Sequence, residues 1–343
     1  MKSVITLIII TILLSCNHRK TSHDFRIDKV DADFTIAFGS CNNQRLPNDL
    51  WNEILKNNPD VWIWGGDNIY ADTDDMKIMQ SYYNEVKNND DYKNFLSKVD
   101  VQGTWDDHDF GINDGGTEFI KKDSSQQLFL DFFDVSLNDS RRNRRGVYYS
   151  KTFEIGDKSI KIIILDTRYF RTALTADPSG NKRYIPTVNN EGTILGSSQW
   201  AWLEKELNNS DDDFTIIMSS IQFLSYEHGF ETWGNMPHEV EKLKSLIVNS
   251  KAERVILLSG DRHLSEISVV EPEGLDYPLY DFTSSGLTHT YTSYTFEPNK
   301  YRKSKVITAK NFGLLKFDLE SNTVSMELRG VRNNLLESMI QKY

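Results

Sequence analysis

Six short and mostly apolar runs, each followed at once by a cluster of polar residues, limit the folds open to this chain more than any other feature. The runs occupy residues 34–38, 61–64, 102–105, 162–165, 214–218 and 255–258. Runs of four or five residues rich in Val, Ile and aromatic residues are typical of strands covered on both faces. Polar residues that recur where such strands end mark the usual location of a ligand site. The pattern therefore predicts buried β-sheet with a site along one edge.

Helical patterns lie between these runs. Residues 47–56 place apolar side chains at helical spacing and begin with Pro47, a residue that suits the start of a helix. Similar spacing begins at Ser198 and again at Pro237. The combination predicts a layered α/β domain in which helices flank the sheet.

The first sixteen residues have the composition of an export signal. Lys2 supplies a positive charge, and residues 4–14 form an apolar run too short to span a membrane as a helix. The ending Leu-x-Ser-Cys at Cys16 resembles a bacterial lipobox, in which the cysteine carries lipid. We expect a lipoprotein signal peptide at 1–16, a polar tether at 17–32 and the folded domain at 33–343; an ordinary signal peptide is the alternative. The mature chain would be exported and lipid-anchored to a bacterial membrane, in the periplasm or at the cell surface.

The chain has two cysteines, so lipid on Cys16 would leave Cys41 without a partner for an internal disulfide. Cys41 is then a buried apolar residue, a reactive thiol or a metal ligand. The formal net charge of −11 offers no broad basic field for nucleic acid, and no nucleic-acid partner is expected. The dense basic run at 141–145 is typical of a solvated loop.

The polar clusters contain the groups that a two-metal hydrolase needs. A pair of metal ions activates water and neutralises phosphoryl oxygens, provided that a carboxylate bridges the ions and other loops supply the remaining ligands. Carboxylates, imidazoles, a phenol, an amide and a thiol all occur where the runs end.

Four of these clusters carry a family resemblance. They are Gly39-Ser40-Cys41, Gly66-Asp67-Asn68-Ile69-Tyr70, Asp106-Asp107-His108-Asp109 and Gly260-Asp261-Arg262-His263. Their order and spacing resemble the alkaline phosphatase D family of the calcineurin-like metallophosphoesterase superfamily. The resemblance extends from about Phe34 to Leu328.

The resemblance implies an α/β fold for residues 33–343, a four-layer α-β-β-α metallophosphoesterase sandwich with two mixed β-sheets flanked by helices. It implies metal-dependent hydrolysis of phosphate esters, of the alkaline phosphatase or phosphodiesterase type. Asp67 would bridge two metals, Cys41, Tyr70 and His263 would complete a site for Fe3+, and Asp107 and Asp261 would hold Ca2+. His108 would be the general acid, oriented by Asp109 or a nearby carboxylate, and Arg168 would bind or orient the phosphate.

The middle histidine of the superfamily has no counterpart here, and Gln222 is the best substitute as a metal ligand. Asn42, Asn68 and Asn113 are weaker candidates. Asp166 either joins the site or braces the sheet. Among the histidines outside the motifs, His289 is the one that could line the site, whereas His228 and His238 are typical surface or loop residues.

Other functions remain open at this stage. A phospholipase- or teichoic-acid-type phosphodiesterase is the nearest alternative, and the insert-like segment 170–190 would influence that choice. A non-catalytic, metal-stabilised binding protein is more remote, because Asp67 and His108 are both present. A serine hydrolase is disfavoured, since the sequence has no Gly-x-Ser-x-Gly motif.

Overall fold

The computed structural model describes residues 32–343. The expected signal peptide, Cys16 and most of the expected tether lie outside the described residues. Within residues 32–343, no helix combines the length and the apolar character that a membrane span requires.

Two six-stranded mixed sheets form the centre of the domain. The first has the order β14 (Leu335–Lys342), β13 (Thr323–Gly330), β12 (Asn311–Asp318), β1 (Phe34–Gly39), β2 (Val61–Gly65) and β3 (Asp100–Thr104). The second has the order β10 (Glu266–Val270), β11 (Leu279–Thr283), β9 (Val255–Ser259), β8 (Phe214–Met218), β5 (Lys158–Ile164) and β4 (Tyr149–Ile155). All six predicted runs form strands. β1, β2 and β3 run parallel in the first sheet, and β5, β8 and β9 run parallel in the second.

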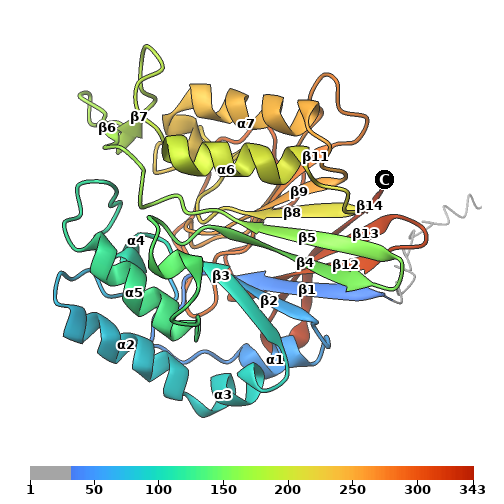
Figure 1. Cartoon of the computed structure of the whole chain (residues 1–343), viewed down its shortest axis with the longest axis horizontal. Helices are drawn as coiled ribbons and strands as arrows, with labels where there is room; N and C mark the ends of the chain where they lie inside the picture. Colours follow the sequence, from blue (N-terminus) through green and yellow to red (C-terminus); the bar gives the residue numbers. More distant parts are fainter. Residues whose placement is uncertain (1–31) are drawn as a thin grey trace, which may run out of the picture.

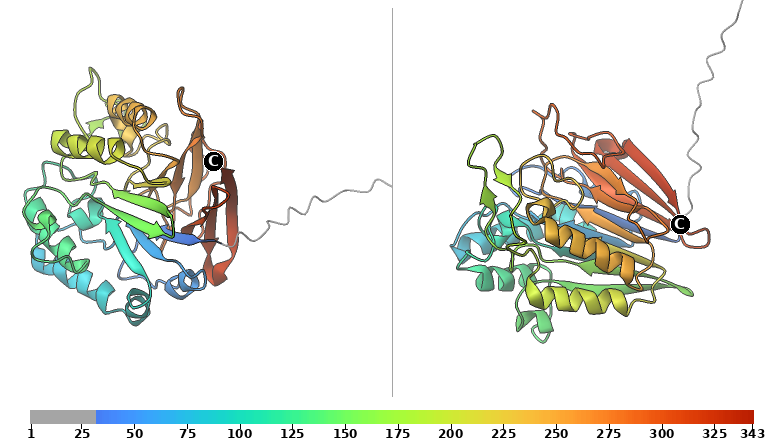
Figure 2. Two further views of the ribbon diagram at one scale, coloured as in Figure 1. Left: turned by 45° about the vertical axis from the view of Figure 1, so that its right-hand side comes forward. Right: turned by 90° about the horizontal axis from the view of Figure 1, so that it is seen from above.

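Helices cover the outer faces of the sheets, which gives the predicted four layers (Figures 1 and 2). The first sheet is covered by α1 (Trp51–Leu55), α2 (Met76–Asn88), α3 (Asp90–Leu96), α4 (Asp107–Phe110) and α5 (Lys122–Phe132). The second is covered by α6 (Gly196–Asn208) and α7 (Pro237–Asn249). Short 3-10 turns occupy Ser140–Arg142, Trp233–Asn235 and Val331–Asn333.

The helix predicted for residues 47–56 is shorter than expected, because it begins only at Trp51. The side chain of Asn48 accepts a hydrogen bond from the backbone nitrogen of Leu50, at 3.0 Å. Such a local bond offers the backbone an alternative to the helical pattern, so the segment after Pro47 is a turn.

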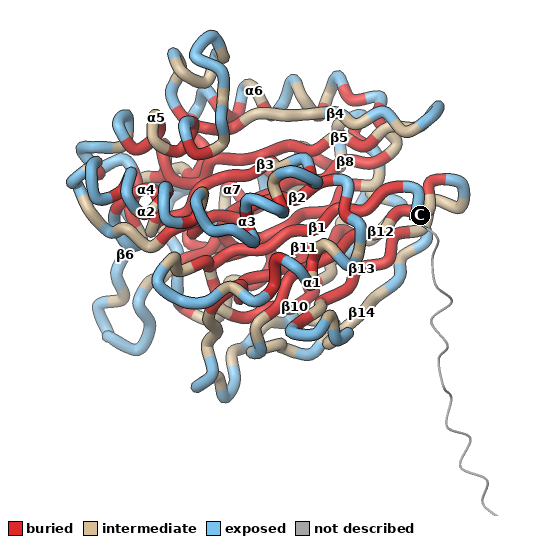
Figure 3. The backbone as a smooth tube through the Cα atoms, turned by 90° about the horizontal axis from the view of Figure 1, so that it is seen from below, coloured by how far each residue is buried: buried red, intermediate tan, exposed pale blue. Residues whose placement is uncertain are grey.

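Alternation along the strands divides the apolar residues among three cores. On β2, Ile63 faces the opposite sheet, whereas Trp62 and Trp64 face the helices of the first sheet. On β8, Ile216 likewise faces inward and Ile217 packs against α6 and α7. Because both faces of the central strands are covered, their backbone is buried throughout, as Figure 3 shows.

A small arm extends from the sandwich between β5 and α6. It contains the two-residue strands β6 (Thr175–Ala176) and β7 (Tyr184–Ile185), which pair antiparallel. The arm lies within the predicted insert at 170–190 and projects at the upper left of Figure 1.

An aromatic cluster joins the first helices to the first sheet. The ring of Trp51 lies 5.4 Å from Trp62, 5.3 Å from Trp64, 4.8 Å from Tyr92 and 5.1 Å from Phe95, measured between centroids. Aromatic pairs at these separations add to the free energy that burial alone supplies. Trp51 is therefore the residue that fixes α1 and α3 on the sheet.

We predict that Trp51→Ala lowers the free energy of unfolding by about 3–5 kcal/mol, because it leaves a cavity among these rings. Urea unfolding followed by circular dichroism measures this change. Leu137→Ala is the matched control, since Leu137 is 81% exposed and its removal should change the free energy by no more than about 0.5 kcal/mol. Equal effects of the two substitutions would contradict this account of the packing.

Candidate metal centre

The candidate ligands come from loops that follow parallel strands of both sheets. Cys41 follows β1, Asp67 follows β2, Asp107 follows β3, and Asp261 and His263 follow β9. Parallel strands end at the same edge of a sheet, so the two sheets bring these five residues together where their edges meet.

The first group contains Cys41, Asp67 and His263, whose ligand atoms all lie within 4.8 Å of one another. The Sγ atom of Cys41 lies 3.4 Å from Oδ2 of Asp67. The Tyr70 hydroxyl lies 3.0 Å from the same oxygen and 2.8 Å from Nε2 of His263. Thiol, phenol, imidazole and carboxylate thus converge on one point.

The second group is built around Asp107. Its carboxylate lies within the same 4.8 Å limit of Asp67 and His108, and separately of Asp106 and Asp261. Asp67 therefore belongs to both groups. Its Oδ1 atom is buried and has no hydrogen-bond partner among the described residues. A buried carboxylate oxygen without a partner is costly, and a metal ion shared between the groups would satisfy it.

The ligand loops hold an unusual backbone conformation. Cys41, Asp67, Asp261 and His263 all have positive φ angles, of 64°, 51°, 69° and 53°. Residues with side chains rarely adopt this region, and surrounding structure must impose it. Three of these residues belong to the first group and Asp261 to the second.

Two glycines allow these loops to approach one another. A Cβ atom on Gly66, whose φ is +94°, would lie 2.5 Å from Cβ of Asp106. A Cβ atom on Gly260 would lie 2.6 Å from Oγ of Ser40 and 2.8 Å from the Gly65 carbonyl. Larger residues at these positions would separate the loops after β1, β2, β3 and β9.

The electrostatics of the site favour a bound cation. Burial raises the pKa of the Cys41 thiol to about 11 and, with the charge of Asp107, raises the pKa of Asp261 to about 8. Burial also raises the pKa of Asp67 well above its usual range. These groups resist ionisation together unless a positive charge lies among them.

The imidazole of His263 is in the form that binds metals. Burial and the neighbouring His289 lower the pKa of His263 to about 3, so the ring is neutral at neutral pH. His289 stands beside the site as the sequence suggested, with ring centroids 4.4 Å from His263 and 5.0 Å from Tyr70. The thiol, carboxylate, phenol and imidazole of the first group fit a metal ion, which Cys41, Asp67, Tyr70 and His263 would hold.

His108 lies at the accessible side of the second group. Its Nδ1 atom is 2.7 Å from Oδ2 of Asp72, and its ring stacks on Tyr70 with 4.1 Å between centroids. Although burial opposes it, the charges of Asp67 and Asp72 raise the pKa of His108 to about 11. With Nδ1 engaged, Nε2 is the ring nitrogen left for a ligand or a substrate.

The structure corrects the role expected for Asp109, because Asp72 makes the contact with the His108 ring. Asp109 is buried and accepts hydrogen bonds from the Asp106 nitrogen at 2.7 Å, the Asp67 nitrogen at 3.2 Å and the Asn68 amide at 2.6 Å. Burial raises the pKa of Asp109 to about 7. Asp109 fastens the loop after β2 to the loop after β3 and so positions ligands.

The role expected for Arg168 is also corrected. Its side chain is completely buried, and it forms ion pairs with Asp106 and, at 2.6 Å, with Glu231. Glu231 in turn pairs with the buried Arg171 at 2.8 Å. A guanidinium without exposed surface cannot bind a substrate phosphate, so Arg168 neutralises the carboxylates beneath the site.

Gln222 does not join either group of ligands. Its Nε2 atom donates to Glu266 at 3.0 Å and to Thr283 at 2.9 Å, which directs the amide toward β10 and β11. Asn68 is a better candidate for a ligand than Gln222, because its Oδ1 atom is buried without a hydrogen-bond partner in residues 32–343. Asn42 donates through its backbone nitrogen to the Asp67 carbonyl at 2.9 Å and through its side chain to the Asn68 carbonyl at 3.0 Å, so it braces the loop after β2. Asn113 is exposed.

Asp166 braces the two sheets. Its carboxylate accepts hydrogen bonds from the Trp105 indole at 2.8 Å and from the backbone nitrogens of Val147, Arg168 and Tyr169, each at 2.9 Å. With its oxygens occupied in this way, the bracing role is the one that the geometry supports.

Sequence reasoning missed several acidic residues at the site, namely Asp72, Asp106, Asp114 and Glu231. Asp106 stands inside a recognised block and Asp72 lies two residues beyond another, and these positions were an available signal. Glu231 and Asp114 lie in loops with no motif, and only the fold brings them to Asp107.

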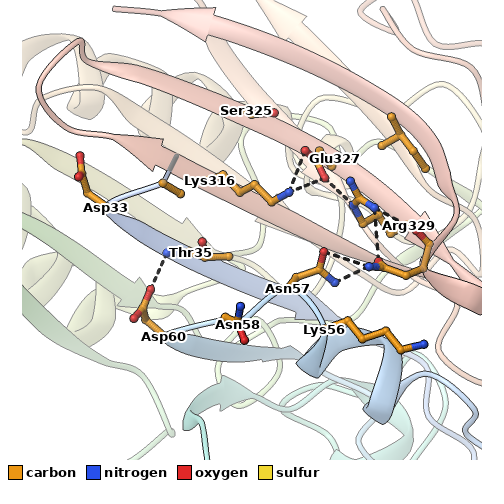
Figure 4. Close-up of a pocket in the computed structure, with 13 residues that line it drawn as sticks. Asp33, Thr35, Lys56, Asn57, Asn58, Asp60, Lys316, Ser325, Glu327 and Arg329 are labelled. Atoms are coloured by element: carbon orange, nitrogen blue, oxygen red, sulfur yellow. Dashed lines mark hydrogen bonds and ion pairs between the residues drawn. The ribbon is translucent and has the colours of Figure 1, made fainter. Parts of the chain in front are cut away.

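A cavity apart from these residues lies at the opposite end of β1 and β2 (Figure 4). It measures about 600 Å³ and is lined by residues such as Asp33, Lys316 and Arg329. Lys316 and Arg329 form ion pairs with Glu327, at 2.9 Å and 2.5 Å, so its carboxylate offsets part of their charge. Its side chains offer neither imidazole nor thiol, so the edge that carries Asp67 and not this cavity is the candidate centre.

Two mixed sheets between helical layers, with two ligand groups that share a carboxylate at one edge, define the class of metallophosphoesterases. The family model of PhoD-like phosphatases matches residues 36–328. The chain belongs to the PhoD-like phosphatase family, which agrees with the resemblance found in the sequence motifs.

Individual proteins show more distant similarity. Alkaline phosphatase D of Bacillus subtilis (strain 168) is 24% identical over 181 residues, which cover 47% of this chain and 30% of that protein. The chain therefore matches under a third of that relative's length. A solved structure of PhoD has a TM-score of 0.69 and 17% identity, covering 90% of this chain and 68% of the other. A dimetal phosphatase from Danio rerio has a TM-score of 0.54 and 13% identity, covering 91% of this chain and 100% of the other. These two structures share the fold.

We predict that metal-free protein loses stability as the pH rises from about 6.5 to 9. The pKa of Asp261 is about 8 and that of His108 about 11, above the ordinary values near 4 and 6.5, so in this window the folded state keeps protons that the unfolded state releases. His263, whose folded pKa is about 3, is neutral in both states above pH 6.5 and does not contribute. The loss is at most about 1.4 kcal/mol per pH unit for each proton retained.

Urea unfolding in chelator at pH 6.5 and pH 9 measures the effect. Asp261→Asn is the control, because it removes the proton that Asp261 retains and should reduce the slope. Added metal should also reduce it, since metal binding requires deprotonated ligands. Metal-free protein that is equally stable at both pH values would contradict the assignment.

Proposed function

We propose that this chain hydrolyses phosphate esters with water activated by two metal ions. The observation that carries the proposal is the position of Asp67, whose carboxylate belongs to both ligand groups and keeps one buried oxygen unpaired. Membership of the PhoD-like phosphatase family supports the activity, as does the similarity to proteins named alkaline phosphatase D and dimetal phosphatase.

When bound, the metal pair would lower the pKa of a water molecule and neutralise phosphoryl oxygens. The residues of the chain would do the rest. Asp67 would hold the two ions together, and the buried pairs of Arg168 and Arg171 with Asp106 and Glu231 would keep the second group in place. His108 would donate a proton to the leaving-group oxygen through Nε2, because Asp72 holds its Nδ1 atom.

The donor types support different ions in the two groups. Thiolate, phenolate and imidazole from Cys41, Tyr70 and His263 suit Fe3+, whereas the oxygen donors Asp107 and Asp261 suit a hard divalent ion such as Ca2+. We therefore propose Fe3+ in the first group and Ca2+ in the second.

The ester class is the finer part of the proposal. The arm at 170–190 stands beside the candidate centre, and a phospholipase- or teichoic-acid-type diesterase is the alternative to a general phosphatase. We also propose export and lipid anchoring at Cys16, on the sequence pattern of residues 1–16. Labelling with palmitate, abolished in Cys16→Ala, tests the anchor.

We predict that Asp67→Asn reduces hydrolysis of aryl phosphate monoesters and diesters to background, because the metals lose their shared ligand. His108→Ala should lower kcat by about 10²–10⁴-fold while metal content stays unchanged, as expected for loss of a proton donor. Steady-state kinetics and elemental analysis on the same preparations measure both effects. His238→Ala is the control, since His238 lies on α7 and contacts the Gly192 carbonyl, away from the ligands.

Asp67→Asn should remain folded, because it replaces a buried carboxyl of raised pKa with a neutral amide. Thermal unfolding in chelator should show stability at least equal to that of metal-free wild type. Full activity in Asp67→Asn would overturn the mechanism.

We predict that Cys41→Ser lowers the iron content of purified protein, because a hydroxyl is a weaker ligand than a thiolate for this ion. Ser285→Ala is the matched control: it removes the hydroxyl that lies 3.0 Å from the sulfur and leaves the thiol in place. Elemental analysis measures iron per chain in each variant. Unchanged iron in Cys41→Ser would show that Cys41 is not a ligand.

A further inference from the structure

The arm between β5 and α6 places a cation at the edge of the metal centre. The guanidinium of Arg183, the residue before β7, lies 2.5 Å from Oδ2 of Asp114. The Tyr184 hydroxyl donates to the same oxygen at 2.7 Å. Asp114 is itself part of the centre, because its backbone nitrogen donates to Oδ2 of Asp107 at 2.7 Å and its carboxylate groups with Asp107 and Glu231.

Arg183 differs from the other arginines around the site in its exposure. Arg168, Arg171 and Arg262 have side chains that are 0%, 1% and 9% exposed, and each is paired with a buried or nearly buried carboxylate. The side chain of Arg183 is 51% exposed. Its Nη1 group makes no hydrogen bond to any residue in 32–343. Arg183 is thus the guanidinium that can meet a molecule arriving from solvent.

The backbone of the arm holds this residue in a defined place. The nitrogens of Arg183 and Tyr184 both donate to the Gly229 carbonyl, at 3.0 Å and 2.9 Å. Gly229 has a φ of +83°, and a Cβ atom there would lie 2.7 Å from the side chain of Lys182. A further bond of 2.8 Å joins the Thr187 nitrogen to the Asn235 carbonyl. The backbone at Arg183 is therefore held in place before any ligand binds.

We propose that Arg183 binds a second negatively charged group of the substrate, a carboxylate or a phosphate beside the ester that is cleaved. The inference rests on the proposed function, since it takes the first group of the substrate to be a phosphate at the metal centre. A planar guanidinium with a free face matches the oxygens of either anion. Asp114 occupies one edge of the Arg183 guanidinium and orients the other edge.

The simpler role for the pair is a latch that only holds the arm against the domain. An exposed ion pair of this kind contributes about 0–1 kcal/mol, and Tyr184 shares the contact with Asp114. The two roles make different predictions, because a latch responds to the loss of either residue, whereas an anion site responds to loss of the charge.

We predict that purified, metal-containing protein binds para-carboxyphenylphosphonate about tenfold more tightly than phenylphosphonate, a free-energy difference of about 1.4 kcal/mol. Isothermal titration calorimetry gives both Kd values and requires no hydrolysis. Arg183→Ala should abolish the preference for the carboxylated ligand and leave the Kd of phenylphosphonate within about twofold. A para-phosphonophenylphosphonate ligand repeats the comparison with phosphate-like charge.

Two matched variants separate the roles. Tyr184→Phe removes the hydroxyl that donates to Asp114 and accepts from Nε of Arg183 at 3.2 Å, but leaves Nη1 free. It should keep the preference, whereas a latch would lose it in this variant too. Lys182→Ala removes a neighbouring cation of the same arm, whose amino group contacts the Glu227 carbonyl, and should also keep the preference. Equal Kd values for both ligands in wild type, or loss of the preference in Tyr184→Phe, would overturn the proposal. Binding without turnover would count against the proposed function and not against the anion site.

Discussion

The candidate centre depends on one electrostatic constraint, the crowding of carboxylates around Asp67 at the edge where two sheets meet. Asp67, Asp107, Asp106 and Asp261 lie too close together for all to be charged in a buried site. The chain balances part of this charge from below, through Arg168 and Arg171. The negative charge around Asp67 is left unbalanced, and the unpaired oxygen of Asp67 marks where a cation would complete the site. The buried arginines thus neutralise enough negative charge for the domain to fold, and enough negative charge remains to bind a metal ion.

The backbone carries the cost of that arrangement. Cys41, Asp67, Asp261 and His263 occupy the left-handed region, and Gly66 and Gly260 bring their loops into contact. Each strained residue costs on the order of 1–3 kcal/mol, which the three apolar cores must offset. The strands that precede these loops are buried on both faces, so the loops start from a rigid base. At these four residues the strain fixes the direction of a candidate ligand.

The sequence predicted the layers and most of the residues that the structure brings together in the two groups, because both leave local signals. Most strands that precede a candidate ligand are apolar runs, as β1 before Cys41 and β2 before Asp67 are. The more polar β3 precedes Asp107. The errors concern properties that only folding decides. Arg168 looked available for phosphate, but Glu231, more than sixty residues away in sequence, covers and pairs it. Asp109 adjoins His108 in sequence, yet the short helix α4 turns it toward the backbone of Asp106 and of the loop after β2 and leaves the imidazole to Asp72.

The arm shows how the same edge can combine fixed chemistry with variable recognition. The ligands stand on strands that both sheets hold rigidly, so a change in any of them disturbs the metals. Arg183 stands on a separate hairpin that contacts the centre through Asp114 and is anchored to the domain by backbone bonds to Gly229 and Asn235. Because those anchors use carbonyl groups, the side chains of the arm are free to vary without loosening it. Selectivity for the group beside the scissile phosphate can therefore change without altering the charge balance around Asp67.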